Sequence, residues 1–202
     1  MCIRDSIGFV DGAVSTPSDV EEVKMFREKS KVLVAIGACA CTGGVNTLKN
    51  YQKEEDYRKY VYGEKWQKFP TIPAQPCSAF VKVDYELPGC PMNKFEFAEL
   101  AKCVLLGKPF KLPSEPVCVE CKKKGNLCVY EKGMTCLGPV TRAGCGAICP
   151  TYGSKCEGCR GLVDKPNLQA AVENMVNLYG LKMEDVLADF RMFGAYQKEQ
   201  IP

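Results

Sequence analysis

Short apolar runs and helical patterns alternate along the first half of the chain. Residues 7–10 form a short apolar run, and residues 31–36 form a second one that is apolar after Lys31 and is followed by Gly37. The second run is typical of a strand buried on both faces of a parallel sheet. Between them, the segment Thr-Pro-Ser-Asp at residues 16–19 predicts a helix start, because its threonine can cap the helix and its proline suits the first turn. This helix is expected to end near residue 29. The apolar run at residues 80–83 predicts another strand.

Two further segments of the first half are expected to lie outside regular structure. Residues 37–44 are rich in glycine and are predicted to form a loop, not a helix start. Ligands in open α/β sheets bind beyond the carboxyl ends of strands, where this loop is expected. It lacks the sequence of a phosphate-binding loop. Residues 51–76 are polar and aromatic, which indicates an excursion from the sheet with one helix near residues 55–62.

Helical periodicity returns at residues 93–106, where Asn93 with Glu96 predicts an N-terminal cap. Leu100 and Leu105 are expected on the buried face of this helix, and Gly107 at its end. Prolines then mark a boundary near residue 113, after which no periodicity is seen until about residue 166.

The end of the chain predicts two amphipathic helices at residues 167–179 and 183–192, packed over the preceding segment. Four apolar side chains of these helices are expected in the core: Met175, Leu178, Met183 and Leu187.

Eight of the fourteen cysteines fall within the 42 residues 118–159, which is more than packing alone requires. Eight thiolates suit two four-thiolate metal sites, and the glycines between them allow the backbone to approach a cluster. Structural zinc is the competing interpretation, since the Cys-x-x-Cys pairs at 118–121 and 156–159 suit it. A zinc module with no redox role therefore stays open at this point.

Composition excludes several classes of function. The chain has no histidine, which excludes His-containing zinc sites and imidazole bases, so no catalytic residue is expected. Disulfide-dense chains are usually short and secreted, which favours reduced thiolates in the cytoplasm. No apolar run approaches the roughly 20 residues of a membrane span. A net charge of +3, without basic residues interleaved with aromatics, gives no signal for nucleic acid.

Two cysteine-bearing turns and the C-terminal array together carry a family resemblance. The turns are Gly37-x-Cys39-Ala-x-x-Gly43-Gly44 and Pro88-Gly89-Cys90-Pro91, and the array includes Cys136-Leu-Gly-Pro-Val-Thr-x-x-x-Cys145 and Cys156-x-Gly-Cys159. Over nearly the whole chain this pattern resembles the small subunit of nickel–iron hydrogenases, in particular the cytoplasmic F420-non-reducing and sulfhydrogenase delta type. The related 20 kDa subunit of NADH:ubiquinone oxidoreductase shares the turns but lacks an eight-cysteine array.

The resemblance implies an α/β fold: a partial flavodoxin-like parallel sheet with helices over residues 1–112, followed by a loop-rich iron–sulfur domain over residues 113–202 closed by two helices. It also implies two complete [4Fe-4S] sites. The first ligand set, called here the distal quartet, is Cys118, Cys121, Cys128 and Cys136. The second, the medial quartet, is Cys145, Cys149, Cys156 and Cys159.

By the same resemblance, Cys39 and Cys90 are two ligands of a third, proximal cluster. The Cys-x-x-Cys pair that supplies its other ligands is not found, and residues 1–6 match nothing in the family. We therefore expect an N-terminally truncated chain with an incomplete proximal site, for which nothing positions Cys2 or Cys41 as substitutes.

The function implied by the resemblance is a cytoplasmic electron relay. Electrons would pass between the nickel–iron centre of a separate large subunit and a further redox subunit, either a flavin or an iron–sulfur protein. Cys39 and Cys90 would face the large subunit, and the distal quartet the redox partner. The remaining cysteines at positions 41, 77 and 103 are interpreted as packing thiols.

Overall fold

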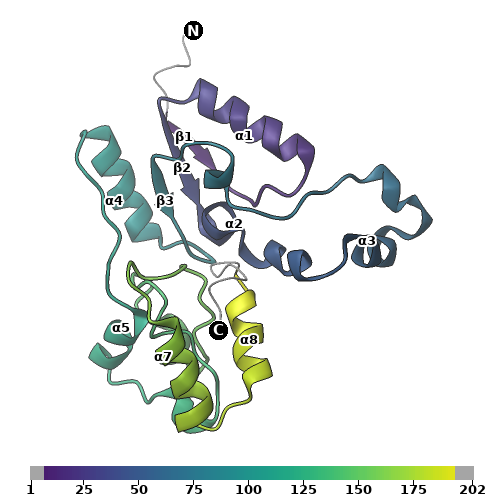
Figure 1. Ribbon diagram of the computed structural model, residues 1–202. Coiled ribbons are helices and arrows are strands. Elements are labelled where there is room, and N and C mark those ends of the chain that lie inside the picture. Colours follow the sequence, from purple (N-terminus) through teal and green to yellow (C-terminus); the bar gives the residue numbers. More distant parts are fainter. Residues whose placement is uncertain (1–6, 194–202) are drawn as a thin grey trace.

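The computed structural model describes residues 7–193, and its centre is a small parallel sheet. In the described part of the chain the strand order is β1 (Ile7–Val10), β2 (Val32–Ile36), β3 (Tyr85–Leu87). Ile7 pairs with Val32, and Val34 with Tyr85. The inner residues of central strand β2 are fully buried, which confirms a strand covered on both faces. The predicted α/β class is therefore confirmed (Figure 1).

Two helices cover opposite faces of this sheet. Helix α1 (Pro17–Lys29) places Val23 against Ala35, and α4 (Lys94–Leu105) places Leu100 against Val34 (Figure 1). Neighbouring side chains of a strand point to opposite faces, so residues 34 and 35 anchor one helix each. The sheet therefore lies between two helical layers.

The start of α1 has the predicted capping box. The Asp19 N–H donates to Thr16 Oγ1 at 3.2 Å, and the Thr16 N–H donates to Asp19 Oδ2 at 2.9 Å. The predicted start and end of this helix, at residues 17 and 29, are confirmed.

Asp84 ties the end of α1 to the sheet. Its carboxylate pairs with Arg27 and accepts a hydrogen bond of 2.8 Å from the Leu33 N–H. Burial raises the pKa of Asp84, but these donors outweigh burial and leave the pKa below its ordinary value. The ionised carboxylate therefore stabilises the fold.

We expect Asp84→Asn to lower the free energy of unfolding by about 1–3 kcal/mol at pH 7. Because a depressed pKa contributes stability that is lost as pH falls through it, the difference from wild type should shrink below about pH 4. Urea unfolding of protein without iron, at about pH 7 and about pH 3, measures this, because acid would release the sulfide of a cluster; exposed Glu28→Gln is the matched control. An equal loss of unfolding free energy at both pH values would contradict the stabilising role of the charged Asp84 carboxylate.

The glycine-rich segment after β2 is a helix, so the loop prediction is wrong. Helix α2 (Gly37–Thr42) begins at Gly37 (φ 81°) and is capped by Gly43 (φ 84°), whose N–H donates to the Cys39 carbonyl. Its alanines at 38 and 40 are buried, because small side chains let this helix pack closely on the sheet. A 3₁₀ helix follows over Gly44–Tyr51.

The strand predicted at residues 80–83 is also wrong. Phe80, Val81 and Val83 pack partly buried against the cluster that contains Cys77, outside the named strands. A 3₁₀ turn, Cys77–Ala79, precedes them. The third strand forms at Tyr85–Leu87, where the register with β2 is available. Apolar character alone did not distinguish a packed turn from a strand.

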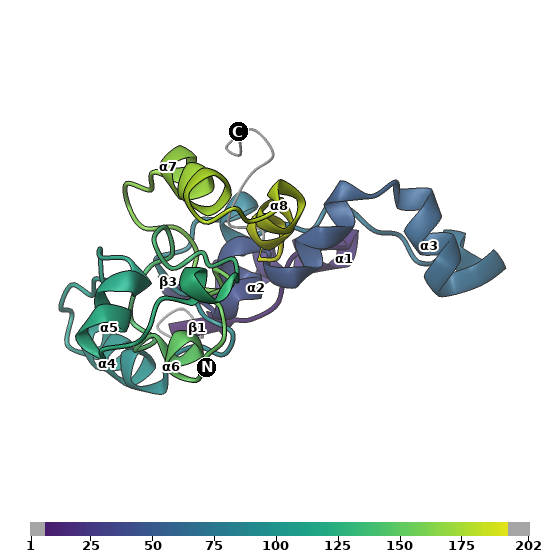
Figure 2. The ribbon, with the colours of Figure 1, turned by 90° about the horizontal axis from the view of Figure 1, so that it is seen from below.

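The excursion predicted after residue 51 is present. Helix α3 (Glu54–Tyr62) and a 3₁₀ helix (Gly63–Lys68) lie at the far end of an arm that projects from the rest of the molecule (Figure 2). Arg58 is buried within the arm and donates to the Trp66 and Phe69 carbonyls, both at 2.8 Å. The arm thus contains its own polar core.

Helix α4 begins at the predicted cap, with the Phe95 N–H donating to Asn93 Oδ1 at 2.9 Å. Glu96 does not complete this cap; it turns away to pair with Arg160. Leu105 is 75% exposed, so its predicted burial is wrong, and Cys103 occupies the buried face instead.

The segment after residue 113 contains short helices, contrary to the expected absence of regular structure. They are α5 (Val117–Lys123), a 3₁₀ helix (Val129–Lys132) and α6 (Ile148–Thr151). Isolated elements of four to seven residues produce too little periodicity to be read from the sequence.

Two helical segments close the chain over this region, as predicted. They are α7 (Leu168–Glu173), continued by a π-helical turn (Asn174–Leu178), and α8 (Met183–Arg191). Met175 is buried as expected, but Leu178 and Met183 are exposed. The π turn adds a residue per turn and so rotates the face that follows it. No helix among residues 7–193 is both long and apolar enough to cross a bilayer.

Candidate metal centres

The distal quartet lines one cavity. Helix α5 supplies Cys118 and Cys121, and the 3₁₀ helix that follows lies between Cys128 and Cys136. The other walls are largely apolar, including Val117 and Val129. Four cysteines that span residues 118–136 thus line the same cavity.

Electrostatics within this cavity favour a positively charged occupant. Burial, and then the neighbouring sulfurs of Cys136, Cys121 and Cys128, together raise the pKa of Cys118 to about 12. Four thiolates cannot gather in an apolar cavity without a compensating charge. Because metal binding requires deprotonated thiols, iron or zinc would supply that charge. The donor set therefore fits a metal centre.

The medial quartet lines a second cavity, together with Cys90. Cys156 is buried and Cys149 exposed, so this cavity reaches from the interior to the surface. Burial raises the pKa of Cys149, and Cys145 raises it further. All four predicted ligands therefore line one cavity.

The two quartets meet at Cys136 and Cys156. The Cys156 N–H donates to Cys136 Sγ at 3.3 Å, and the Leu137 N–H donates to the Cys156 carbonyl at 2.8 Å. Gly138 passes close beside them, since a Cβ at that position would lie 3.2 Å from Cys118 Sγ. The backbone therefore places one quartet directly against the other.

The structure also brings Cys39 and Cys90 together. The Ala38 N–H donates to the Gly89 carbonyl at 2.9 Å, which joins the two turns. Burial raises the pKa of Cys39, and Cys90 raises it further. Cys90 lines the medial cavity as well, and its backbone N–H is hydrogen-bonded to the sulfur of Cys159. Cys2, considered as a substitute ligand, lies outside the described residues.

The three remaining described cysteines are buried thiols. Cys41 Sγ lies 3.4 Å from the Ala35 carbonyl, and burial raises the pKa of Cys77 to about 11. Cys103 lies on α4 beside Glu99. All three are at most 9% exposed, in keeping with their interpretation as packing residues.

The four sulfurs of each quartet do not surround a common centre at metal–ligand distances. Among residues 7–193, no three Cys, Asp or Glu side chains are arranged to hold one metal ion. Each quartet is therefore defined by the cavity that its four thiols share, and not by a geometry already set for one ion.

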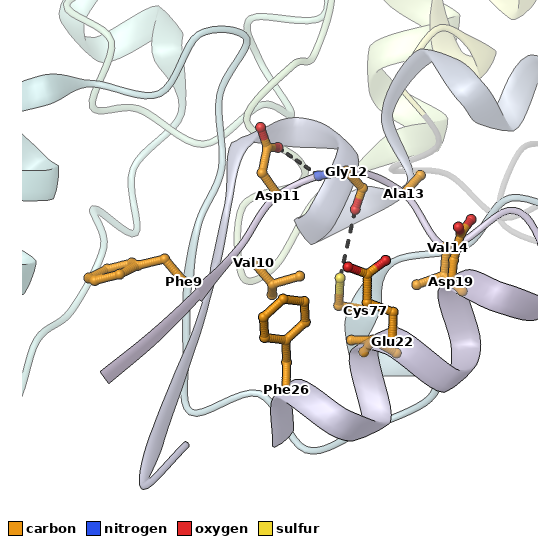
Figure 3. Close-up of a pocket in the computed structure, with 11 residues that line it drawn as sticks. Phe9, Val10, Asp11, Gly12, Ala13, Val14, Asp19, Glu22, Phe26 and Cys77 are labelled. Carbon is orange, nitrogen blue, oxygen red and sulfur yellow. Dashed lines mark hydrogen bonds between the residues drawn. The ribbon is translucent and has the colours of Figure 1, made fainter. Parts of the chain in front are cut away.

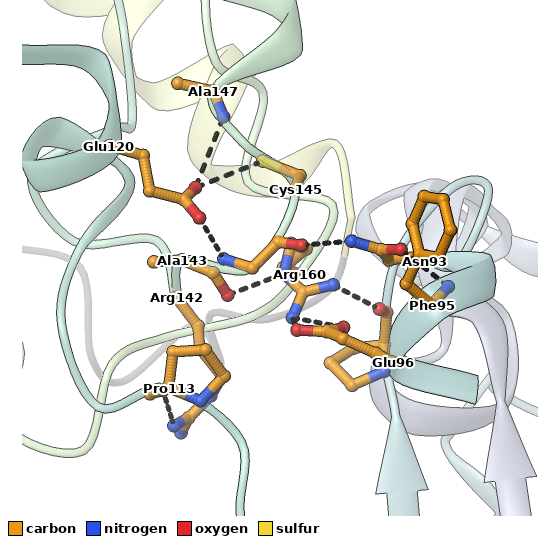
Figure 4. A network of polar contacts seen from close by, with 12 residues as sticks. Asn93, Phe95, Glu96, Pro113, Glu120, Arg142, Ala143, Cys145, Ala147 and Arg160 are labelled. Carbon is orange, nitrogen blue, oxygen red and sulfur yellow. Dashed lines mark hydrogen bonds and ion pairs between the residues drawn. The ribbon is translucent and has the colours of Figure 1, made fainter. Parts of the chain in front are cut away.

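Two charged residues of the site were missed by sequence reasoning (Figure 4). Glu120 accepts hydrogen bonds from the Gly144 and Ala147 N–H groups at 3.0 and 3.2 Å. Arg160 is 2% exposed and pairs with Glu96. Each stands next to a predicted ligand in sequence, which is the signal that could have identified it.

A separate cavity of about 400 Å³ lies at the carboxyl end of β1 (Figure 3). Phe9, Asp11 and Phe26 line it, with Cys77 Sγ 3.7 Å from the Gly12 carbonyl. Asp19, also in its wall, is engaged in the cap of α1. None of the ten predicted ligands lies in the wall of this cavity.

Comparisons with known proteins show the family of the chain. Residues 3–104 match the family described as NADH ubiquinone oxidoreductase, 20 Kd subunit. A subunit of the vhu F420-non-reducing hydrogenase of Methanocaldococcus jannaschii is 37% identical over 185 residues, covering 77% of this chain and 64% of the relative. Sulfhydrogenase 2 subunit delta of Pyrococcus furiosus is 36% identical over 184 residues, covering 91% and 73%.

Among solved structures, an actinobacterial-type NiFe-hydrogenase from Ralstonia eutropha H16 matches with a TM-score of 0.53. The match covers 80% of this chain and 60% of that one at 17% identity, and supports the fold alone. The chain thus spans about two thirds of the length of the curated relatives described above.

Proposed function

The chain belongs to the NADH ubiquinone oxidoreductase 20 kDa subunit family, and from this premise we propose that it is the electron-transfer subunit of a nickel–iron hydrogenase. Its relatives named as hydrogenase subunits and its eight-cysteine array favour a hydrogenase within that family. One observation carries the proposal: each quartet lines its own cavity, and the two quartets meet at Cys136 and Cys156.

We assign one [4Fe-4S] cluster to the distal quartet and one to the medial quartet. Such a cluster, when bound, supplies reversible one-electron transfer. The chain contributes the thiolates, apolar walls that exclude water, and N–H donors to sulfur. The Cys156 N–H on Cys136 Sγ and the Cys90 N–H on Cys159 stabilise negative charge and so favour the reduced state.

The order of the sites suggests a path through the molecule. Cys90 adjoins the medial quartet and lies beside Cys39, so we assign these two residues to a proximal site that faces the hydrogenase large subunit. At the other end, Lys122 lines the distal cavity, and Lys123 and Lys124 are exposed beside it. These lysines suit an acidic redox subunit. No bond-making step is assigned to this chain.

We place this relay in the cytoplasm. The thirteen cysteines within residues 7–193 are all free, and thiols in this number persist where the surroundings are reducing. Ligation by reduced cysteines requires the same condition.

Metal analysis after anaerobic reconstitution with iron and sulfide tests the cluster assignment. We expect about eight iron and eight sulfide per chain, because each quartet would hold a four-iron cluster. A Cys39→Ser/Cys90→Ser variant separates any proximal contribution and should also retain about eight iron. A colourless protein containing two zinc ions and no acid-labile sulfide would contradict the proposal and favour a structural zinc module.

Anaerobic co-purification tests the partner. A tagged chain expressed in its native host should recover a large subunit that carries two Cys-x-x-Cys motifs, in equal amount. The Cys39→Ser/Cys90→Ser variant is purified in parallel for comparison, because it alters the surface that we assign to contact with the large subunit. Recovery of quinone-reductase subunits in place of that protein would contradict the hydrogenase assignment.

A further inference from the structure

We propose that Glu120 is a positioning residue that holds the Cys145 loop, residues 143–147, in its ligand geometry and thereby links the two quartets. The inference rests on the proposed function, in that both quartets bind clusters. Glu120 belongs by sequence to the distal quartet, because α5 carries it between Cys118 and Cys121. Its carboxylate, however, reaches the loop of the medial quartet (Figure 4).

The carboxylate contacts this loop with both oxygens. Oε1 accepts the Gly144 N–H at 3.0 Å, and Oε2 accepts the Ala147 N–H at 3.2 Å. Cys145 Sγ lies 3.9 Å from Oε2. Glu120 therefore fixes the backbone on both sides of a ligand and also places a negative charge beside its sulfur.

The conformation of the loop explains why it needs such support. Ala147 has φ 48°, in the left-handed region that residues with a Cβ rarely adopt. The same residue is completely buried, so its N–H has no access to water. A buried N–H without an acceptor costs about 1–3 kcal/mol. The Glu120 carboxylate supplies that acceptor and stabilises the strained backbone.

The opposite side of the loop is held by Asn93, at the start of α4, and by Arg160, next to the medial ligand Cys159. Asn93 Nδ2 donates to the Gly144 carbonyl at 2.6 Å, and Arg160 Nε donates to the Ala143 carbonyl at 2.8 Å. Glu120 supplies the matching attachment from the distal-ligand helix. The loop is thus hydrogen-bonded on one side to Asn93 and Arg160 and on the other side to Glu120. Loss of Glu120 would remove the contacts on the side that faces the distal quartet.

Alanine and glutamine at this position separate attachment from charge. Glu120→Ala removes the acceptors, so we expect the medial cluster to be lost and the iron content to fall from about eight to about four per chain. Glu120→Gln keeps one of the two oxygen acceptors and removes the negative charge near Cys145. We expect it to retain iron while the midpoint potential of one cluster shifts upward, because a nearby negative charge opposes reduction.

Glu131→Ala is the matched control, since Glu131 also lies between two distal ligands but is exposed. In protein without iron, we expect Cys145 to be alkylated faster in Glu120→Ala than in wild type or the control, relative to Cys118, as measured by mass spectrometry. Full iron content, an unchanged spectrum and an unchanged alkylation ratio in Glu120→Ala would overturn the proposal.

If the alanine variant does not fold, the glutamine variant tests the proposal. An unshifted set of midpoint potentials in Glu120→Gln would then overturn the proposal. Failure of the proposed function gives a different result: wild-type protein would take up no iron, whereas the alkylation ratio of Cys145 would still depend on Glu120.

Discussion

Cys156→Ser is expected to remove about half of the iron from the reconstituted protein and to alter the spectrum of the iron that remains. Cys156 is a predicted medial ligand, and it is buried against the distal quartet. Its backbone N–H donates to Cys136 Sγ, so a disturbance at residue 156 reaches a distal ligand through a 3.3 Å hydrogen bond. Iron and sulfide analysis, with electron paramagnetic resonance of the reduced protein, measures both effects.

Cys103→Ser is the control for this variant. Cys103 is buried to a similar degree, but it lies on α4 and lines neither quartet cavity. We expect its substitution to lower stability by about 1 kcal/mol and to leave the iron content unchanged. Full iron retention in Cys156→Ser, or equal iron loss in both variants, would contradict the assigned ligand set.

Arg160→Met is expected to produce the largest loss of stability, about 3–5 kcal/mol, because it leaves Glu96 as a buried charge without its partner. Arg160 is 2% exposed, and the Glu96 side chain is 15% exposed. The same guanidinium donates to the Pro88 carbonyl at 3.1 Å, beside the Cys90 turn. Urea unfolding of reconstituted protein measures the change, and the Arg160→Met/Glu96→Met double variant should recover part of the loss.

The loss should also depend on pH. Burial raises the pKa of Glu96, and Arg160 acts in the opposite direction. Without Arg160 the folded protein binds a proton at Glu96 more readily than the unfolded chain does, so the stability of the variant should rise as pH falls from about 7 to 5. Exposed Lys102→Met, which breaks an ion pair on the surface of α4, should cost at most about 0.5 kcal/mol. A similar loss in both variants would contradict the role of burial.

Local signals in the sequence identified much of the fold. The cap at Thr16 and the cap at Asn93 each depend on residues within three positions, and both helix starts are confirmed. Helix α2 was missed, since its small residues resemble a loop unless the sheet they pack against is known. The exposed Leu178 lies at the end of a π turn, which changes the helical face in a way that a regular period does not predict.

The same distinction applies to the site. The eight cysteines by themselves predicted only two four-thiolate sites, and the family resemblance divided them into the two sets that line the two cavities. Arg160 was missed, since its acceptor at Pro88 lies 72 residues away and its partner Glu96 looked like part of a helix cap. Its position next to Cys159 marks it as a neighbour of the site, but its contacts with distant segments form only in the folded chain.

A redox titration of reconstituted protein, followed by electron paramagnetic resonance with spin quantitation, tests the central claim most directly. We expect two reducible centres per chain, each with the signal of a reduced [4Fe-4S] cluster, and loss of one centre in Cys156→Ser. Protein that binds iron only as isolated ions, or that shows no reducible paramagnetic centre, would contradict the account.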